Sequence, residues 1–129
     1  MLDRIDIYIE VPRVDYDKLS GDRMGETSES IRKRVQAASN IQQQRFASSL
    51  SDISCNADMR VGEIRQFCKL QDEGQSLLRP AMMQFNLSAR AYHRTLKLAR
   101  TIAGLVGSEE IQSAHLAEAL QYRLRLIVG

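Results

Sequence analysis

The sequence predicts a mainly α-helical fold, a bundle of four to five helices preceded by a single β-strand. Three observations support this prediction. Aromatic residues make up only 5% of the 129 residues and Trp is absent, so the core must rest on aliphatic side chains and Met. Apolar residues recur every three to four positions through most of the chain, as they do in amphipathic helices. Only one segment alternates with period two.

The period-two segment opens the chain, between residues 2 and 11. It is typical of a strand because β-branched residues alternate with polar ones, and Pro12 ends the pattern. The alternating residues are Ile5, Ile7, Ile9 and Val11. A lone strand cannot pair its own backbone donors and acceptors. We therefore expect its sheet to lie outside this chain; the alternative is pairing with a second copy.

The chain accordingly divides into three predicted parts. Residues 1–12 form the terminal strand of a truncated core, and residues 13–27 form a polar linker loop that contains two glycines. Residues 28–129 form the helical domain. A chain of 129 residues is long enough for one domain with a modest core and too short for two comfortable ones.

The first predicted helix begins at Thr27 or Ser28, either of which suits an N-cap. Its inward stripe consists of Ile31, Val35, Ala38, Ile41 and Phe46. After a loop over residues 48–59, a second helix is predicted, with one apolar side. That side consists of Val61, Ile64, Phe67 and Cys68.

Pro80 makes the following stretch irregular. Proline lacks a backbone donor, so we expect Pro80 to begin or kink a short helix. The adjacent Met82 and Met83 are interpreted as residues that fill gaps in the core, because Met adapts to irregular spaces.

The clearest helix begins at Ser88, a good N-cap residue, and ends at Gly107, which suits the position after the last turn. Its inward stripe consists of Tyr92, Leu96, Ala99, Ala103 and Val106. A last helix, which Ser113 can cap, turns Leu116, Ala119, Leu120 and Leu124 inward.

Charge and cysteine content exclude several classes of function. The net charge of +2 is too small to imply nucleic-acid binding by charge alone. Cys55 and Cys68 form no C-x-x-C pair and lie far in sequence from both histidines, so we expect reduced thiols, no metal site and a cytoplasmic protein. The alternative for the two cysteines is a disulfide. No apolar run approaches the ~20 residues of a membrane span, and no signal-peptide pattern opens the chain.

Arg90 is the residue that a purely structural helix explains least well. It lies in the first turn after Ser88, where the helix dipole disfavours a cation. Arg94 and Lys97 follow at i+4 and i+7, so three cations share one face. These side chains either are solvated or form a phosphate site, since a helix N-terminus and an arginine fork both favour bound oxyanions. Spacing alone does not decide between the two.

Four ordered segments resemble the C-terminal domain of magnesium-chelatase-like AAA+ proteins, in the ComM branch. The most specific is LSARAYHR at residues 87–94, continued by LARTIA at residues 98–103. The others are LDRID at residues 2–6, CNADM at residues 55–59 and HLAEALQYR at residues 115–123. The resemblance covers essentially the whole chain and implies that the helices form an AAA+ lid.

The resemblance also implies roles for arginines. Arg90 matches the sensor 2 arginine, which contacts the γ-phosphate of ATP held by the same subunit, and Arg94 is a further candidate contact. Arg4 matches the arginine finger, which acts in trans on the ATP of a neighbouring subunit by stabilising charge on the transferred phosphoryl group. The alternative for Arg4 is a strand-end arginine paired with Asp3 or Asp6.

The chain departs from a complete ATPase in two respects. It contains no G-x-x-x-x-G-K-[ST] loop to cradle phosphates, and the acidic strand that orders Mg²⁺ is absent as well. We therefore expect this chain alone not to be an enzyme. ATP and Mg²⁺ are expected as cofactors of a longer parent protein that is an AAA+ ATPase.

The resemblance implies a homo-oligomeric ring, expected to be a hexamer, in which the lid contacts its own core and neighbouring subunits. In the ComM branch the implied partner is DNA and the implied activity is branch migration by a helicase during natural transformation. The first alternative is the lid of a chelatase motor that drives Mg²⁺ into a porphyrin. The second is a stand-alone helical interaction module, which the unpaired strand disfavours. No membrane partner is expected.

Overall fold

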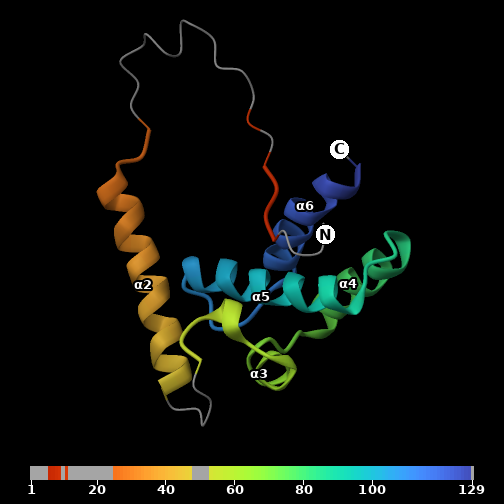
Figure 1. Ribbon diagram of the computed structural model, residues 1–129, viewed down its shortest axis with the longest axis horizontal. Coiled ribbons are helices and arrows are strands. Elements are labelled where there is room, and N and C mark those ends of the chain that lie inside the picture. The colour runs from red at the N-terminus through yellow and green to blue at the C-terminus, as the bar shows by residue number, and fades with distance from the viewer. Residues whose placement is uncertain (1–5, 10, 12–24, 48–52, 129) are drawn as a thin grey trace, which may run out of the picture.

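The computed structural model describes residues 6–9, 11, 25–47 and 53–128, with side chains described as far as residue 122 (Figure 1). This part of the chain contains five α-helices and one 3₁₀ turn, η2, which confirms the predicted helical fold. The elements are α2 (Ser28–Ala47), η2 (Asn56–Asp58), α3 (Val61–Phe67), α4 (Asp72–Gln84), α5 (Ala89–Leu105) and α6 (Ser113–Val128).

Helix α5 lies at the centre of the domain (Figure 1). It packs most extensively on α6 and also contacts α2, η2 and α3, while α4 packs on α6. The connections α3–α4 and α5–α6 lie side by side, because Leu70 and Ile111 form a parallel bridge and Gln71 Nε2 donates to Glu110 Oε2. The core is aliphatic as predicted, with two aromatic rings in edge contact, those of Phe46 and Phe67.

Both predicted ends of α5 are confirmed. The Ser88 hydroxyl accepts a hydrogen bond from the Ala91 amide at 3.1 Å, which caps the first turn. At the other end Gly107 has a φ of +76°. The Ser108 amide then donates to the Ala103 carbonyl at 2.8 Å, closing the helix as glycine-terminated helices commonly do. Of the predicted inward stripe, Leu96, Ala99 and Ala103 are buried, whereas Val106 is exposed.

Pro80 does not begin a helix, as one form of the expectation had it: α4 begins at Asp72 and continues through this proline to Gln84. The missing amide of Pro80 would have paired with the carbonyl of Ser76, and both residues lie on the exposed side of the helix, where water can replace the bond. Leu78, on the opposite side, is buried. Gly74 is buried too, and a Cβ there would lie 2.9 Å from Leu116 Cδ1, so this glycine permits close packing of α4 on α6.

The predicted inward stripe of α2 is only partly confirmed. Ala38 and Phe46 are buried, but Ile31, Val35 and Ile41 are exposed. For Ile31 and Val35 the reason is the placement of the helix, since its first half extends away from α5 (Figure 1). Ile41 lies in the second half of α2 and is exposed as well. Amphipathic spacing identifies a helix without ensuring that a partner covers its whole length.

The predicted strand is not a strand in the described residues 6–9 and 11. No strand runs beside it in the described part of the chain, and the side chains of Ile7, Ile9 and Val11 are exposed. A strand is defined by pairing, so an unpaired segment remains irregular. The proposed boundaries between strand, linker and helical domain fall among residues outside the described ranges, except for the helix start at Ser28.

The described residues bear on the expectations about membrane spans and metal sites. Among them, no helix combines the length and apolarity that a bilayer crossing requires. The same residues contain no group of three or more His, Cys, Asp or Glu side chains that could hold a metal ion. Cys55 and Cys68 are both free thiols.

Candidate functional site

A cationic hollow of about 400 Å³ lies between the start of α3 and the first turns of α5. Four cationic side chains line it, together with His93 and three apolar residues, and no carboxylate is among its lining residues. The cations are Arg60, Arg90, Arg94 and Lys97. Concentrated positive charge of this kind favours a bound polyanion.

Helix geometry explains how α5 contributes three of these cations. Arg90, Arg94 and Lys97 recur at helical spacing on one face, as predicted, and all three line the hollow. The opposite face is fixed in the core, where Ala91 is buried and the hydroxyl of buried Thr95 donates to its carbonyl at 2.8 Å. Burial of one face therefore orients the cationic face outward.

The two candidate arginines of α5 differ in their surroundings. Arg94 Nη1 donates to Asp6 Oδ1 at 2.9 Å, and its side chain is 22% exposed. Arg90 is exposed, and its side chain forms no ion pair or hydrogen bond with the described part of the chain. Arg90 is thus the cation at the helix start that is available to a ligand.

Arg4 lies outside the described residues, so its predicted role in trans stays a prediction. Asp6 is two positions further along the chain and contacts Arg94. Asp6 therefore lies beside the cationic hollow, because Arg94 lines it. Sequence reasoning considered Asp6 as a partner of Arg4 and did not find its pairing with Arg94.

A buried polar residue, Asn56, holds the loop that precedes α3. The backbone amide of Asn56 donates to Gln42 Oε1 at 2.8 Å, and its Nδ2 donates to Thr101 Oγ1 at 3.0 Å. Arg45 Nη1 donates to Asn56 Oδ1 at 3.3 Å. This network joins η2 to α2 and α5 and so fixes the position of Arg60 relative to α5.

Arg100 is not part of the cationic face. It is 4% exposed, and its guanidinium donates to the Ser108 and Glu109 carbonyls, both at 2.9 Å, and to the Phe67 carbonyl at 3.5 Å. Burial lowers the pKa of Arg100, and the charge of Arg45 lowers it further. Arg100 therefore ties the α5–α6 connection to the end of α3, a structural role.

Cys68 lies in the core next to these arginines. Burial raises the pKa of the Cys68 thiol to about 11, against the opposing effect of the Arg100, Arg45 and Lys97 charges. A thiol that holds its proton so firmly is a poor nucleophile. The structure therefore gives Cys68 a packing role.

Comparison with known proteins identifies the domain. Residues 25–123 match the family described as magnesium chelatase, subunit ChlI C-terminal. The chain belongs to this family. The match covers α2 to α6 almost completely, including the cationic hollow and the Asn56 network that positions it.

This chain spans about a quarter of the length of the curated relatives that it matches. It is 44% identical over 124 residues to the competence protein ComM of Haemophilus influenzae. It is 40% identical to an uncharacterized protein YifB of Escherichia coli and 36% identical to the YifB of Salmonella typhimurium, each over 123 residues. Each alignment covers 95% of this chain and 23% of the relative. These relatives support the resemblance to the ComM branch.

Sequence reasoning missed one residue of the hollow, Arg60. It immediately precedes α3 and follows the CNADM segment of the chelatase-type domain, which the Asn56 network holds against α5. Its position one residue after that segment is the signal that could have drawn attention to it. Its proximity to α5 depends on tertiary packing, which the spacing of residues cannot show.

Proposed function

We propose that this chelatase-type C-terminal domain is the lid of a ring-forming AAA+ ATPase and that Arg90 contacts the γ-phosphate of ATP held by the core of the same subunit. The observation that supports the proposal most is the exposed Arg90 at the start of α5, in a hollow lined by four cations and no carboxylate. Asp6 compensates Arg94, and a bound polyphosphate would compensate the charge that the exposed Arg90 adds beside that pair.

The residues present fit a polyphosphate better than a metal ion. Arg90, Arg94, Arg60 and Lys97 offer only donors, which phosphate oxygens accept. No metal-holding group occurs among the described residues, so Mg²⁺ would be held by the core of the parent protein. In this proposal the lid orients and neutralises the phosphates, and the parent core supplies the loop that cradles them.

Arg4 completes the proposal as an arginine finger for the ATP site of a neighbouring subunit. Asp6 and Arg94 join its segment to the lid, so movement of the lid on nucleotide binding would also move this segment. The ion pair between Asp6 and Arg94 then connects the sequence next to Arg4 with helix α5, which carries Arg90.

We propose DNA remodelling, as a branch-migration helicase in natural transformation, as the activity of the parent ring. The supporting observation is the 44% identity to a relative named as a competence protein. The second candidate is a chelatase motor that drives Mg²⁺ into a porphyrin, supported by the description of the family itself. Branch-migration assays with defined DNA junctions and metal insertion assays with a porphyrin would separate the two activities.

Substitution of Arg90 tests the nucleotide-sensing role. In the longer parent protein, Arg90→Ala is expected to lower the rate of ATP hydrolysis by about 10²-fold or more, because loss of one preorganised donor to the transition state has an effect of that size. Steady-state phosphate release provides the measurement. Arg32→Ala, an exposed cation on α2, serves as the matched control and should leave turnover unchanged. Wild-type turnover in Arg90→Ala would disprove the role.

Mixed rings distinguish Arg4 from Arg90. An Arg4→Ala subunit should hydrolyse ATP when a wild-type neighbour supplies the finger, whereas an Arg90→Ala subunit should stay inactive beside any neighbour. Turnover measured across mixing ratios of mutant and wild-type subunits gives the comparison. Identical mixing curves for the two variants would contradict the assignment of Arg4 in trans and Arg90 in cis.

A further inference from the structure

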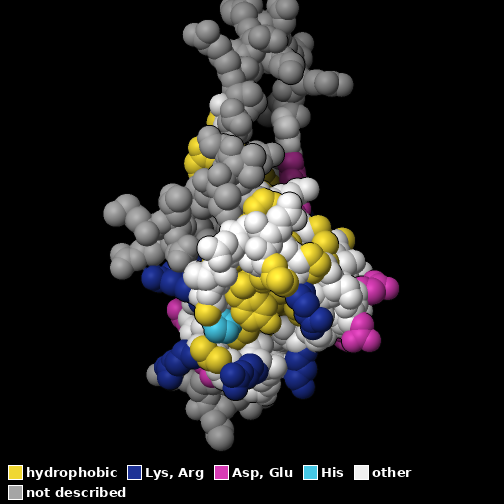
Figure 2. Space-filling view, turned by 90° about the vertical axis from the view of Figure 1, so that its right-hand side faces the viewer, with side chains coloured by type: hydrophobic (Ala, Val, Ile, Leu, Met, Phe, Trp, Pro, Cys, Tyr) yellow, Lys and Arg dark blue, Asp and Glu magenta, His cyan; other side chains and the backbone are white. Residues whose placement is uncertain are grey.

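A second and larger depression adjoins the cationic hollow. It is a groove of about 1060 Å³ between α3, α4 and the first turns of α5, and it shares Ile64 and His93 with the hollow. Its lining includes Leu78, Met82 and Leu96 from the packed helices. Figure 2 shows hydrophobic side chains gathered on this side of the molecule, with Lys and Arg around them.

The apolar lining of the groove combines buried residues, such as Leu78 and Leu96 at 3% exposure each, with adaptable and more exposed ones. Met82 packs against the core, as predicted, but Met83 is 79% exposed, so its expected place in the core is wrong. Both methionines line the groove, next to the ring of Tyr92. Flexible thioether side chains and an aromatic ring are common at surfaces that bind apolar side chains of a partner.

Cations stand on both walls of the groove. Arg65 and Lys69 lie on the α3 side, and Arg79 lies on α4. All three are exposed, and none forms an ion pair within the described part of the chain. The residues that line the groove include no Asp or Glu. The groove therefore has an apolar centre with unmatched positive charge on two sides.

We propose that this groove docks an amphipathic helix of another protein chain, one whose apolar side chains are flanked on both sides by Asp or Glu. Charge complementarity carries the choice of partner, because acidic residues on each flank of a seated helix would face Arg79 on one wall and Arg65 and Lys69 on the other. Helix-in-groove recognition uses apolar anchors at i, i+3, i+4 and i+7, which suit an open apolar channel.

The apolar centre distinguishes this groove from a nucleic-acid surface. A phosphate backbone would need donors along the contact, whereas here Lys and Arg side chains surround a hydrophobic patch (Figure 2). The proposed docking is also separate from the nucleotide-sensing role, since Arg90 does not line the groove.

Two designed peptides test the proposal on the full 129-residue chain. Both are labelled amphipathic helices with Leu at i, i+3, i+4 and i+7; one carries Glu on both flanks and the other carries Lys at the same positions. Fluorescence anisotropy should show binding of the Glu peptide at least about 10-fold tighter than of the Lys peptide, because only the former matches the rim. In NMR spectra of the chain, the backbone amide signals that shift when the Glu peptide is added should belong to α3, α4 and the start of α5.

Matched variants locate the contact. Arg79→Glu should weaken binding of the Glu peptide by about 10-fold or more, whereas Arg32→Glu on α2 should leave it unchanged. Met83→Asp places a carboxylate in the centre of the surface and should weaken binding as well. All three positions are exposed, and circular dichroism would confirm that each variant keeps its helices. Arg90→Ala should bind the peptide normally, which separates this result from the nucleotide test.

Several outcomes would overturn the proposal. Equal affinity for the two peptides, or an unaltered affinity in Arg79→Glu, would remove the charge complementarity. If the chain associates with itself through the groove as its concentration rises, the occupant of the groove is a second copy of the chain. If single-stranded DNA displaces the Glu peptide and shifts the same amide signals, the occupant is nucleic acid. Failure of the Glu peptide to bind the longer parent protein would show that the parent itself covers the groove.

Discussion

At the residue scale, Arg90 and Arg100 show how position on one helix separates binding from structure. Ten residues along a helix turn the side chain to a different face. Arg90 is exposed beside three other cations, whereas Arg100 is 4% exposed and donates to three carbonyls. Buried arginine is tolerated only where such acceptors surround it. The two residues therefore contribute to ligand contact and to packing respectively.

Burial of the Cys68 thiol is expected to make the stability of the domain depend on pH. The pKa of the thiol rises from 9.0 to about 11 on folding, because burial disfavours the thiolate. The folded chain thus holds this proton more tightly than the unfolded chain, so the stabilisation is complete below pH ~9 and is lost as the pH rises to about 11. Urea unfolding across this range should show a loss larger by about 2 kcal/mol in the wild type than in Cys68→Ala. Parallel stability curves would contradict the prediction.

At the element scale, α5 connects local sequence to the site. Ser88 caps its first turn, Gly107 closes its last, and the cationic side chains between them follow from helical spacing. Helix α4 behaves differently. It passes through Pro80 because Leu78 and Gly74 are buried against other elements, so tertiary packing outweighs the local penalty of proline.

Removal of the Ser88 side chain, which caps α5, is expected to lower the stability of the domain. Ser88→Ala loses the 3.1 Å bond to the Ala91 amide and should lower the free energy of unfolding by about 1 kcal/mol. Chemical denaturation provides the measurement. Ser76→Ala, the same substitution at an exposed position inside α4, is the control and should change stability by less than about 0.5 kcal/mol. Equal effects at the two positions would exclude a capping contribution.

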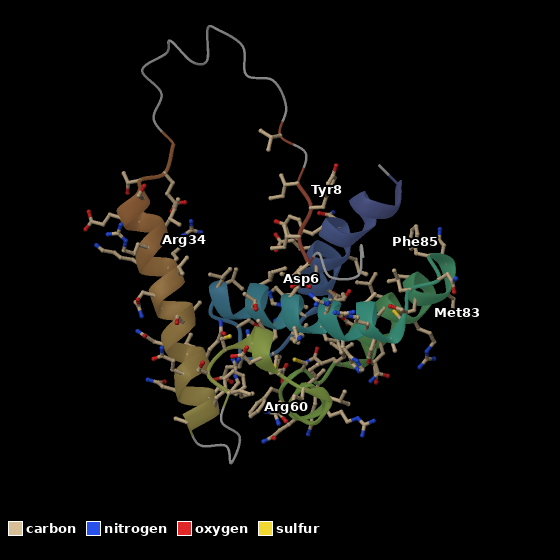
Figure 3. All side chains as sticks on the ribbon, in the orientation of Figure 1. Asp6, Tyr8, Arg34, Arg60, Met83 and Phe85 are labelled. Carbon is tan, nitrogen blue, oxygen red and sulfur yellow. The ribbon has the colours of Figure 1, made fainter. Side chains whose placement is uncertain are left out.

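At the scale of the whole molecule, burial is concentrated around α5 and α6 and decreases towards the start of α2. Ala99, Ala103 and Leu116 are completely buried, whereas Ile31 and Val35 in the first half of α2 are exposed. In Figure 3 this half of α2, which carries Arg34, lies apart from the other helices. The domain therefore has a firmly packed centre and one extended helix end.

Hydrogen exchange should reveal this gradient. Amides of residues 30–36 are expected to exchange at least about 10²-fold faster than those of residues 96–103, because little buried apolar surface opposes local opening of α2. Mass spectrometry of deuterated peptides would measure the difference in the 129-residue chain. Equal protection would show that something covers the first half of α2 in solution.

The sequence by itself determined the helical class, both ends of α5 and the shared face of Arg90, Arg94 and Lys97, since caps and helical spacing are local properties. The resemblance of four segments to magnesium-chelatase-like proteins also predicted the family correctly; the family match over residues 25–123 includes three of the four.

Only the tertiary structure decided which face of each helix packs against another segment and which stays exposed. It placed Arg60 beside α5, buried Arg100 against three carbonyls, and left Met83 and the first half of α2 exposed. Periodicity gives the direction in which a side chain points from its own helix. Burial and charge pairing depend on segments far away in the sequence, so they are settled only when the helices pack.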